Sequence, residues 1–288
     1  MRIYLLIFFT AFSFLTYAQF NTSIIDSNFE QSLIDLGYDS ILDGSVFTAN
    51  ITEVDSLDIS FQNIYDLSGI EDFSSLKYLN CSNNNLDSLI LDYNFALEEL
   101  YCSSNNLLVL IVDSLNNLDI LDCSFNNLIS LDVSLNIELD LLRCSRNQLI
   151  ELYLNTTLAY LYCGDNALTS LDLSSLIFGG LIELECQNNP ISFLNLENNY
   201  SLQHLICQNN SLQEINLEDN INLVFFSIQN NSLDTNNNDI TYLDLSSNCN
   251  LSNIYCSGNM NLYCIQVCDS TQINTWMTNI DSHQYFSS

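Results

Sequence analysis

One 21-residue unit recurs along most of this 288-residue chain. Three consecutive segments, beginning at Leu76, Leu97 and Leu118, share the pattern LxxLxCxxNxLxxLxΦxxxxx, where Φ is apolar. The register restarts in both directions, at spacings of 19 to 28 residues, at Val54, Leu139, Leu158, Leu181, Leu202, Leu223 and Leu251. About ten repeats of this length predict a solenoid, because one unit cannot bury its apolar face without neighbours.

Each unit, numbered from its first leucine, is expected to contain a short parallel β-strand at positions 3 to 5. Alternate side chains of a strand point to opposite faces, so the leucine at position 4 and the cysteine at position 6 should point inward. Positions 3 and 5 should point outward. The inward leucines then form one continuous core, in which we expect Leu121 and Leu142 to be buried.

An asparagine occupies position 9 of nearly every unit. Its amide has both a donor and an acceptor, and it can satisfy backbone groups where the chain leaves the strand. We interpret this column as a structural ladder made of Asn84, Asn105, Asn126, Asn147, Asn166, Asn189 and Asn210, and continued at Asn231 and Asn259.

Most of the cysteines also share one position. Position 6 holds Cys81, Cys102, Cys123, Cys144, Cys163, Cys186, Cys207 and Cys256. Because Ile59 and Ile228 stand at this position in other units, we interpret the thiols as small hydrophobic core residues and assign them no metal. Cys249, Cys264 and Cys268 lie outside the register, and two of them are expected to pair if the protein is exported.

The repeats resemble the leucine-rich repeat family, in the bacterial variety whose strand reads LxxLxCxxN and whose return half reads LxxLDL, as in LTSLDLS at 168–174. The segments IDSNFEQSLIDLGYDSILDG and IYDLSGIEDFSSL are similar to the entry segment of secreted internalin-like proteins. This resemblance implies a mainly β solenoid, an arc with a parallel sheet on its concave face. Its return side would hold short strands or irregular turns, and a small helical cap would precede the repeats.

The sequence predicts four parts. Residues 1–18 have an early Arg, an apolar run and a small-residue end, which is typical of a secretory signal peptide and too short for a membrane anchor. Residues 19–53 form the N-terminal cap, with a helix that starts at a capping box, Ser27-x-x-Glu30, and ends at Gly37. Residues 54–268 hold the repeats, and residues 269–288 close the stack, with Trp276, Met277, Ile280, Tyr285 and Phe286 as its apolar residues. We expect a secreted or cell-surface protein.

The charge of the chain limits its partners. It has 35 acidic and 4 Lys or Arg residues, a formal net charge of −31. Such a surface repels nucleic acid and anionic lipid, so we predict neither as a partner. Cations, basic proteins and neutral glycans remain open.

Catalysis finds little support in the sequence. Its two histidines, His204 and His283, lie far apart, no GxSxG or HExxH motif occurs, and no cofactor is predicted. Pairs of outward carboxylates leave one alternative, a carbohydrate-binding or glycoside-hydrolysing protein on a parallel β-helix. A passive adhesin spacer is a third possibility. The Asn-rich insertion around residues 235–240 is only a partial match to a calcium loop, and we interpret it as a surface excursion.

The outward positions 3 and 5 supply the candidate binding site. Aromatic and aliphatic residues recur there, although solubility alone would favour polar ones. We predict that an extracellular protein, or a glycan, binds the concave face at Tyr78, Tyr101, Asp122, Leu141, Arg143, Arg146, Tyr160, Tyr162 and Phe225. The alternative is that the tyrosines pack on one another across strands and only stiffen the sheet.

Overall fold

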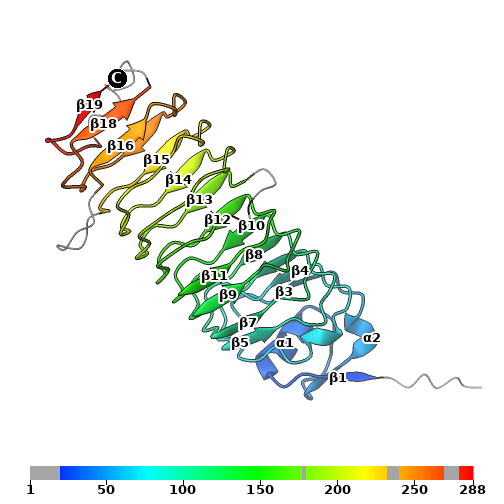
Figure 1. Ribbon diagram of the computed structural model, residues 1–288. Coiled ribbons are helices and arrows are strands. Elements are labelled where there is room, and N and C mark those ends of the chain that lie inside the picture. The colour runs from blue at the N-terminus through cyan, green and yellow to red at the C-terminus, as the bar shows by residue number, and fades with distance from the viewer. Residues whose placement is uncertain (1–19, 175, 177–179, 232–239, 269–278, 288) are drawn as a thin grey trace, which may run out of the picture.

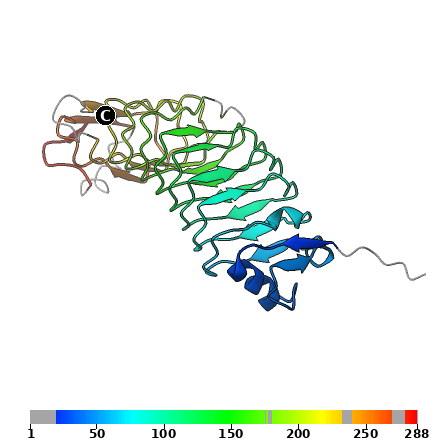
Figure 2. The same cartoon turned by 90° about the horizontal axis from the view of Figure 1, so that it is seen from below.

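The chain folds into a solenoid of stacked turns that follows a small N-terminal cap (Figure 1). The computed structural model describes residues 20–174, 176, 180–231, 240–268 and 279–287. The stack bends along its length (Figure 2). The predicted fold class, a mainly β leucine-rich repeat arc, is confirmed.

Ten parallel strands form the concave sheet, one for each repeat. They are β3 (Ser56–Asp58), β4 (Tyr78–Asn80), β6 (Glu99–Tyr101), β8 (Ile120–Asp122), β10 (Leu141–Arg143), β12 (Tyr160–Tyr162), β13 (Glu183–Glu185), β14 (His204–Ile206), β15 (Phe225–Ser227) and β17 (Asn253–Tyr255). Neighbouring strands pair in register, so that Leu142 lies beside both Leu121 and Leu161. The 19-residue and 23-residue units therefore keep the same register as the 21-residue units.

Shorter sheets line the return side. They are formed by β5 (Ser88–Ile90) with β7 (Val109–Ile111), by β9 (Ser130–Asp132) with β11 (Glu151–Tyr153), and by β16 (Tyr242–Leu245), β18 (Cys264–Val267) and β19 (Tyr285–Ser287). An isolated bridge joins Leu171 to Leu194. The return side thus mixes short strands with irregular turns, as the repeat pattern predicted.

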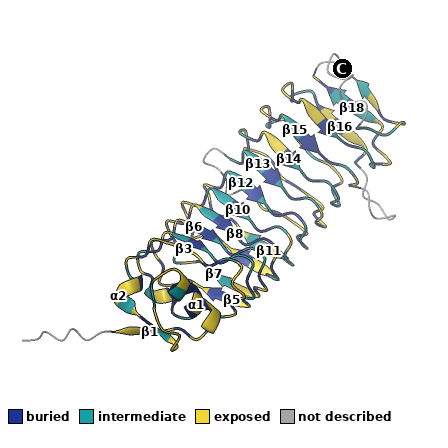
Figure 3. Cartoon of the chain, turned by 180° about the vertical axis from the view of Figure 1, so that it is seen from behind, coloured by how far each residue is buried: buried dark blue, intermediate teal, exposed yellow. Residues whose placement is uncertain are grey.

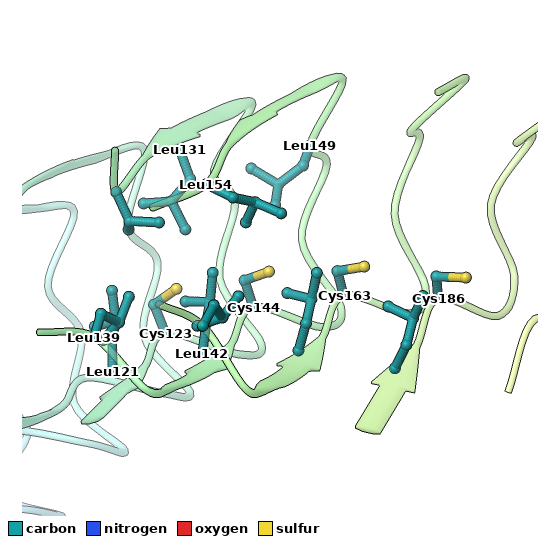
Figure 4. Close-up of a cluster of buried hydrophobic side chains, with 14 of the residues drawn as sticks. Leu121, Cys123, Leu131, Leu139, Leu142, Cys144, Leu149, Leu154, Cys163 and Cys186 are labelled. Carbon is teal, nitrogen blue, oxygen red and sulfur yellow. The ribbon is translucent and has the colours of Figure 1, made fainter. Parts of the chain in front are cut away.

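The core lies between these two sides (Figure 3). In Figure 4, Leu121, Leu142 and the thiols of Cys123 and Cys144 point into the same interior. All four side chains are fully buried, with 0% exposure, so the inward assignment of Leu121 and Leu142 is confirmed. Burial of one such leucine contributes about 1.5–3 kcal/mol, and the repeats share this contribution along the stack.

The cap covers the exposed end of the first repeat. It contains β1 (Asn21–Ser23), which pairs antiparallel with β2 (Ser45–Phe47), and the helices α1 (Ser27–Asp35) and α2 (Thr48–Ile51). The 3₁₀ turn η1 (Ile70–Asp72) follows in the first repeat. Phe29 and Leu33 of α1 are fully buried, and the Phe29 ring lies 6.3 Å from that of Phe73. Leu36, the C-cap residue of α1, is 48% exposed.

The predicted capping box of α1 is wrong. The N-cap is Asp26, whose Oδ1 accepts the backbone N–H groups of Asn28 at 2.8 Å and Phe29 at 3.1 Å. Glu30 is buried and instead accepts three N–H groups from the loop of Asp43–Ser45. A long-range contact therefore uses the carboxylate that local sequence assigned to the cap.

Several sequence-based predictions lie outside the described residues. These are the signal peptide at 1–18, most of the Asn-rich insertion, and the closing residues Trp276 and Met277. At the C-terminal end, the structure pairs Cys249 with Cys268 in a disulfide. None of the described helices has both the length and the apolar character needed to cross a bilayer.

Candidate ligand-binding face

The concave strands present positions 3 and 5 of each repeat to solvent. Each three-residue strand buries its central side chain and leaves the flanking two partly exposed, as β4, β6, β8, β10, β12 and β13 all do. Because the strands pair in register, equivalent side chains form two straight columns along the stack. Eight of the nine candidate residues lie in these columns.

Two tyrosines meet at the N-terminal part of this face. The rings of Tyr78 and Tyr101 lie 5.6 Å apart and are tilted by 45°. The Tyr101 hydroxyl donates to Oε2 of Glu99 at 3.0 Å. Partial burial, with that carboxylate beside it, raises the pKa of Tyr101 to about 12, so the phenol keeps its proton at neutral pH.

An arginine and a tyrosine occupy the centre. Arg143 pairs in register with Asp122 on one side and Tyr162 on the other, and its guanidinium carbon lies 5.1 Å from the Tyr162 ring centroid. The Tyr162 hydroxyl donates to Oε2 of Glu183 at 3.0 Å. Leu141 and Tyr160 pair beside them in the other column. The structure therefore brings Asp122, Leu141, Arg143, Tyr160 and Tyr162 together.

A second aromatic group lies nearer the C-terminus. Phe225 contacts His204, at 6.1 Å between ring centroids, and Tyr255, at 5.5 Å. Two strands, β13 and β14, separate Phe225 from Tyr162. The candidate residues thus form three groups along the face.

Arg146 lies apart from the other candidates. It follows β10 in a turn, with a left-handed backbone (φ 58°), at the edge of the sheet. Its guanidinium carbon lies 4.7 Å from the Phe125 ring centroid, and its Nε is 3.6 Å from a carboxylate oxygen of Asp165. The sequence could not place this side chain, because position 8 belongs to the turn rather than to the alternating strand.

Two carboxyl groups of this face are important although they were not among the predicted site residues. Burial, reinforced by the charge of Asp119, raises the pKa of Asp140. Burial also raises the pKa of Glu185, and the negative charge of the nearby Glu183 raises it further. Asp140 and Asp119 lie in adjacent repeats, whereas Glu185 and Glu183 lie on the same strand, β13.

The position-9 asparagines bind the turns of adjacent repeats together. The Asn105 amide donates to the carbonyl of Cys102 at 3.1 Å and to that of Cys81, one repeat earlier, at 3.0 Å. Its Oδ1 accepts the N–H of Leu86 at 3.0 Å. Corresponding amide bonds recur at Asn84, Asn126, Asn147, Asn166, Asn189, Asn210, Asn231 and Asn259.

The thiols at position 6 lie in the core beneath the same turns. All eight position-6 cysteines are free and buried. Burial raises the pKa of Cys81 and of Cys186 to about 12, so these thiols remain protonated and unreactive at neutral pH.

A second asparagine column was missed in the sequence. Five of its buried members donate to carbonyls of the preceding repeat on the return side, and they are Asn94, Asn136, Asn155, Asn220 and Asn248. A sixth, Asn199, donates to the Glu197 carbonyl of its own repeat. The signal was present, because the third residue after the LDL-like segment is Asn in five repeats, although Asn155 follows its segment directly. Leu115 and Leu176 replace it where the repeat has no asparagine.

One hollow of the described surface lies elsewhere. It has a volume of about 610 Å³ and lies on the return side, between the segments 193–197 and 214–219. Its lining is acidic, with Glu197, Glu214, Glu218 and Asp219. No group of three or more possible metal ligands occurs among the described residues. This hollow does not overlap the aromatic columns.

The fold and the repeat pattern agree with those of solved leucine-rich repeat structures. The functional domain of InlJ from Listeria monocytogenes, which includes a cysteine ladder, matches 87% of this chain at 31% identity, with a TM-score of 0.73. YopM from Yersinia enterocolitica matches 74% of the chain at 21% identity (TM-score 0.55), and the APL1 leucine-rich repeat domain matches 80% at 20% identity (TM-score 0.51). This chain is an internalin-like leucine-rich repeat protein.

The internalin-like chain covers 57% of the InlJ structure, 46% of the YopM structure and 63% of the APL1 structure. No protein-family model and no curated protein matches its sequence. All three structural matches are leucine-rich repeat proteins or share their fold, so they give no support to the β-helix alternative.

Proposed function

We propose that this internalin-like protein is exported and binds an extracellular protein through its concave face. The observation that carries the proposal is the half-buried aromatic surface along the sheet, in which Tyr101, Tyr162 and Phe225 each belong to a separate group. Aromatic side chains supply large contact area with little loss of conformational entropy, which makes them frequent anchors of protein interfaces. No catalytic role is assigned to the chain.

Export is supported by the signal-like pattern of residues 1–18 and by the disulfide between Cys249 and Cys268. Expression of the full chain in a secreting bacterial host should release a protein that begins at Gln19. N-terminal sequencing of the protein in the medium tests this. A product that retains Met1 and stays in the cytoplasm would contradict export.

Binding is tested with two matched variants. Tyr101 and Tyr153 both donate their hydroxyl to a glutamate two residues earlier, Glu99 and Glu151, but they lie on opposite sides of the solenoid. Immobilised wild-type protein is used to capture proteins from the fluid surrounding the source bacterium, and each captured protein is purified and titrated. Tyr101→Ala should weaken the binding of a specific partner by about 1–3 kcal/mol, whereas Tyr153→Ala should change the affinity for that partner little.

The opposite result would place the binding surface on the return side. Because Tyr101 is only partly buried, both variants should fold, and circular dichroism should confirm that they do. Equal affinity of wild type and Tyr101→Ala for every captured protein would reject the concave face as the binding site.

A further inference from the structure

We propose that the concave face selects a polypeptide segment rich in lysine and arginine. This inference rests on the proposed function above and adds the charge class of the partner. The occupant is an extended or surface-exposed chain whose basic side chains lie along the columns of carboxylates and tyrosines in repeats three to seven.

Negative charge dominates the middle of the face. The concave strands β6, β8, β10, β12 and β13, with the residue just before each strand, carry seven carboxylates: Glu98, Glu99, Asp119, Asp122, Asp140, Glu183 and Glu185. Arg143 is the single Lys or Arg in the same set of residues. Lys77, one repeat earlier, is bonded to Glu98 at 2.6 Å.

One cation already lies on this face and shows how another is held. The Arg143 guanidinium lies over the Tyr162 ring, with Asp122 beside Arg143 and Glu185 beside Tyr162 in the strand register. A cation over an aromatic face is attracted by the ring quadrupole, and neighbouring carboxylates add to that attraction. The arrangement is a cation site built from one tyrosine and two acidic neighbours.

Tyr101 has the same kind of surroundings. Its ring stacks on Tyr78, Glu99 accepts its hydroxyl, and Asp122 lies beside it in register. The three Lys and Arg side chains of the described residues are engaged elsewhere, with Lys77 on Glu98, Arg143 on Tyr162 and Arg146 on Phe125. A basic side chain of a partner fits over the Tyr101 ring as Arg143 fits over that of Tyr162.

A bound cation would stabilise the charged forms of the carboxylates on this face. Asp140 and Glu185 are partly buried, and their raised pKa values show that their charged forms are poorly solvated. An incoming ammonium or guanidinium group offsets that cost. The net charge of −31 also steers a basic partner toward the protein and repels an acidic one.

The test separates this face from the general negative charge of the protein. One variant combines Asp122→Asn, Asp140→Asn and Glu185→Gln. The control combines Asp132→Asn, Asp172→Asn and Asp244→Asn on the return side, so that it loses the same three charges. Each control aspartate accepts an N–H from a serine two residues later, which asparagine can also do.

The probes are three synthetic twelve-residue peptides in which glycine alternates with lysine, glutamine or glutamate. Their affinities for the full mature protein are measured by calorimetry at two salt concentrations. Wild type and the return-side control should bind the lysine peptide equally. The concave variant should bind it about tenfold more weakly, since three partly exposed ion pairs together are worth about this factor.

Three results would overturn the inference. They are equal weakening by both triple variants, an unchanged affinity of the concave variant, and no preference for the lysine peptide over the glutamate peptide. Failure of this inference is distinguishable from failure of the proposed function. Suppose that a captured protein is neutral or acidic and that Tyr101→Ala weakens its binding. The concave face would then remain the binding site, but the inference of a basic partner would be wrong.

Discussion

The amide of a position-9 asparagine holds two neighbouring turns at once. Asn105 donates to carbonyls of Cys81 and Cys102 and accepts from Leu86, all within 3.1 Å. These hydrogen bonds are buried. A buried polar group that loses its partner costs about 1–3 kcal/mol of stability. The asparagine column is therefore expected to contribute strongly to the free energy of unfolding.

Two adjacent asparagines allow a direct measurement of that contribution. Asn105→Ala should lower the free energy of unfolding by about 1–3 kcal/mol. Asn106, whose side chain is exposed, is the control, and Asn106→Ala should change it by less than about 0.5 kcal/mol. Urea denaturation followed by circular dichroism measures both, and equal losses would mean that the buried amide bonds contribute nothing.

The buried thiols are expected to make the free energy of unfolding fall at alkaline pH. Burial raises the pKa of Cys186 to about 12 in the folded protein, whereas in the unfolded chain the thiol has its ordinary pKa of about 9.0. Above pH 9 the unfolded chain loses this proton while the folded chain keeps it, so stability is full at lower pH and falls as pH rises toward 12.

Substitution by an apolar residue should reduce this dependence. Isoleucine already occupies the equivalent position at Ile59 and Ile228. Cys186→Val should therefore flatten the fall of the unfolding free energy between pH 9 and 11 by up to about 1.4 kcal/mol per pH unit. Urea titrations of both proteins at pH 7, 9 and 10.5 test this, and parallel curves would show that the thiol does not ionise on unfolding.

At the scale of elements, the cap helix depends on a side chain outside it. Asp26 accepts two N–H groups at the start of α1 through Oδ1, and through Oδ2 it accepts those of Tyr65 and Asp66 in the first repeat. One carboxylate therefore starts the helix and fastens it to the solenoid.

Removal of that carboxylate should weaken both contacts. Asp26→Ala should lower the free energy of unfolding by about 1–2 kcal/mol or more, because a helix cap and two further bonds are lost. Asp35→Ala, in the last turn of α1, should be neutral or slightly stabilising, since an acidic residue opposes the helix dipole there. Thermal unfolding of the two variants distinguishes these effects, and equal melting temperatures would contradict the role of Asp26.

The strands were predictable from sequence because every repeat shows the same alternation of inward and outward positions. Ten copies of positions 3 to 5 fixed the faces of Leu121, Tyr101 and Arg143, and hence their neighbours across strands. Asp26 was missed because Ser27 and Glu30 match a capping box in local sequence, whereas in the fold Glu30 instead accepts N–H groups of the loop at 43–45. Arg146 was misplaced on the sheet face because its turn has a left-handed backbone that the alternation of a strand does not describe.

At the scale of the whole molecule, each repeat contacts only its neighbours. Stability in such a stack is close to a sum over repeats and interfaces, so damage at one end stays local. The disulfide between Cys249 and Cys268 joins the ninth and tenth repeats, 19 residues apart in sequence. It is expected to hold the C-terminal end and to leave the middle unaffected.

Hydrogen exchange can test this locality. Cys249→Ser should speed amide exchange in residues 240–268 by at least about tenfold, while residues 97–153 should exchange as in the wild type. Reductant added to the variant should have no further effect, because the eight buried cysteines are already free. Faster exchange throughout the chain would mean that the solenoid unfolds as one cooperative unit.

The asparagine bonds between repeats also bear on how such a protein can change its length. Each repeat offers its successor the same carbonyls and N–H group, and each receives the same amide from the next. Loss of residues 118–138, one whole unit, would bring Asn147 to the Cys102 carbonyl and the Leu107 N–H that Asn126 now binds. Unequal recombination in the gene can therefore add or remove whole repeats without breaking the core, while it brings new pairs of surface residues together on the concave face.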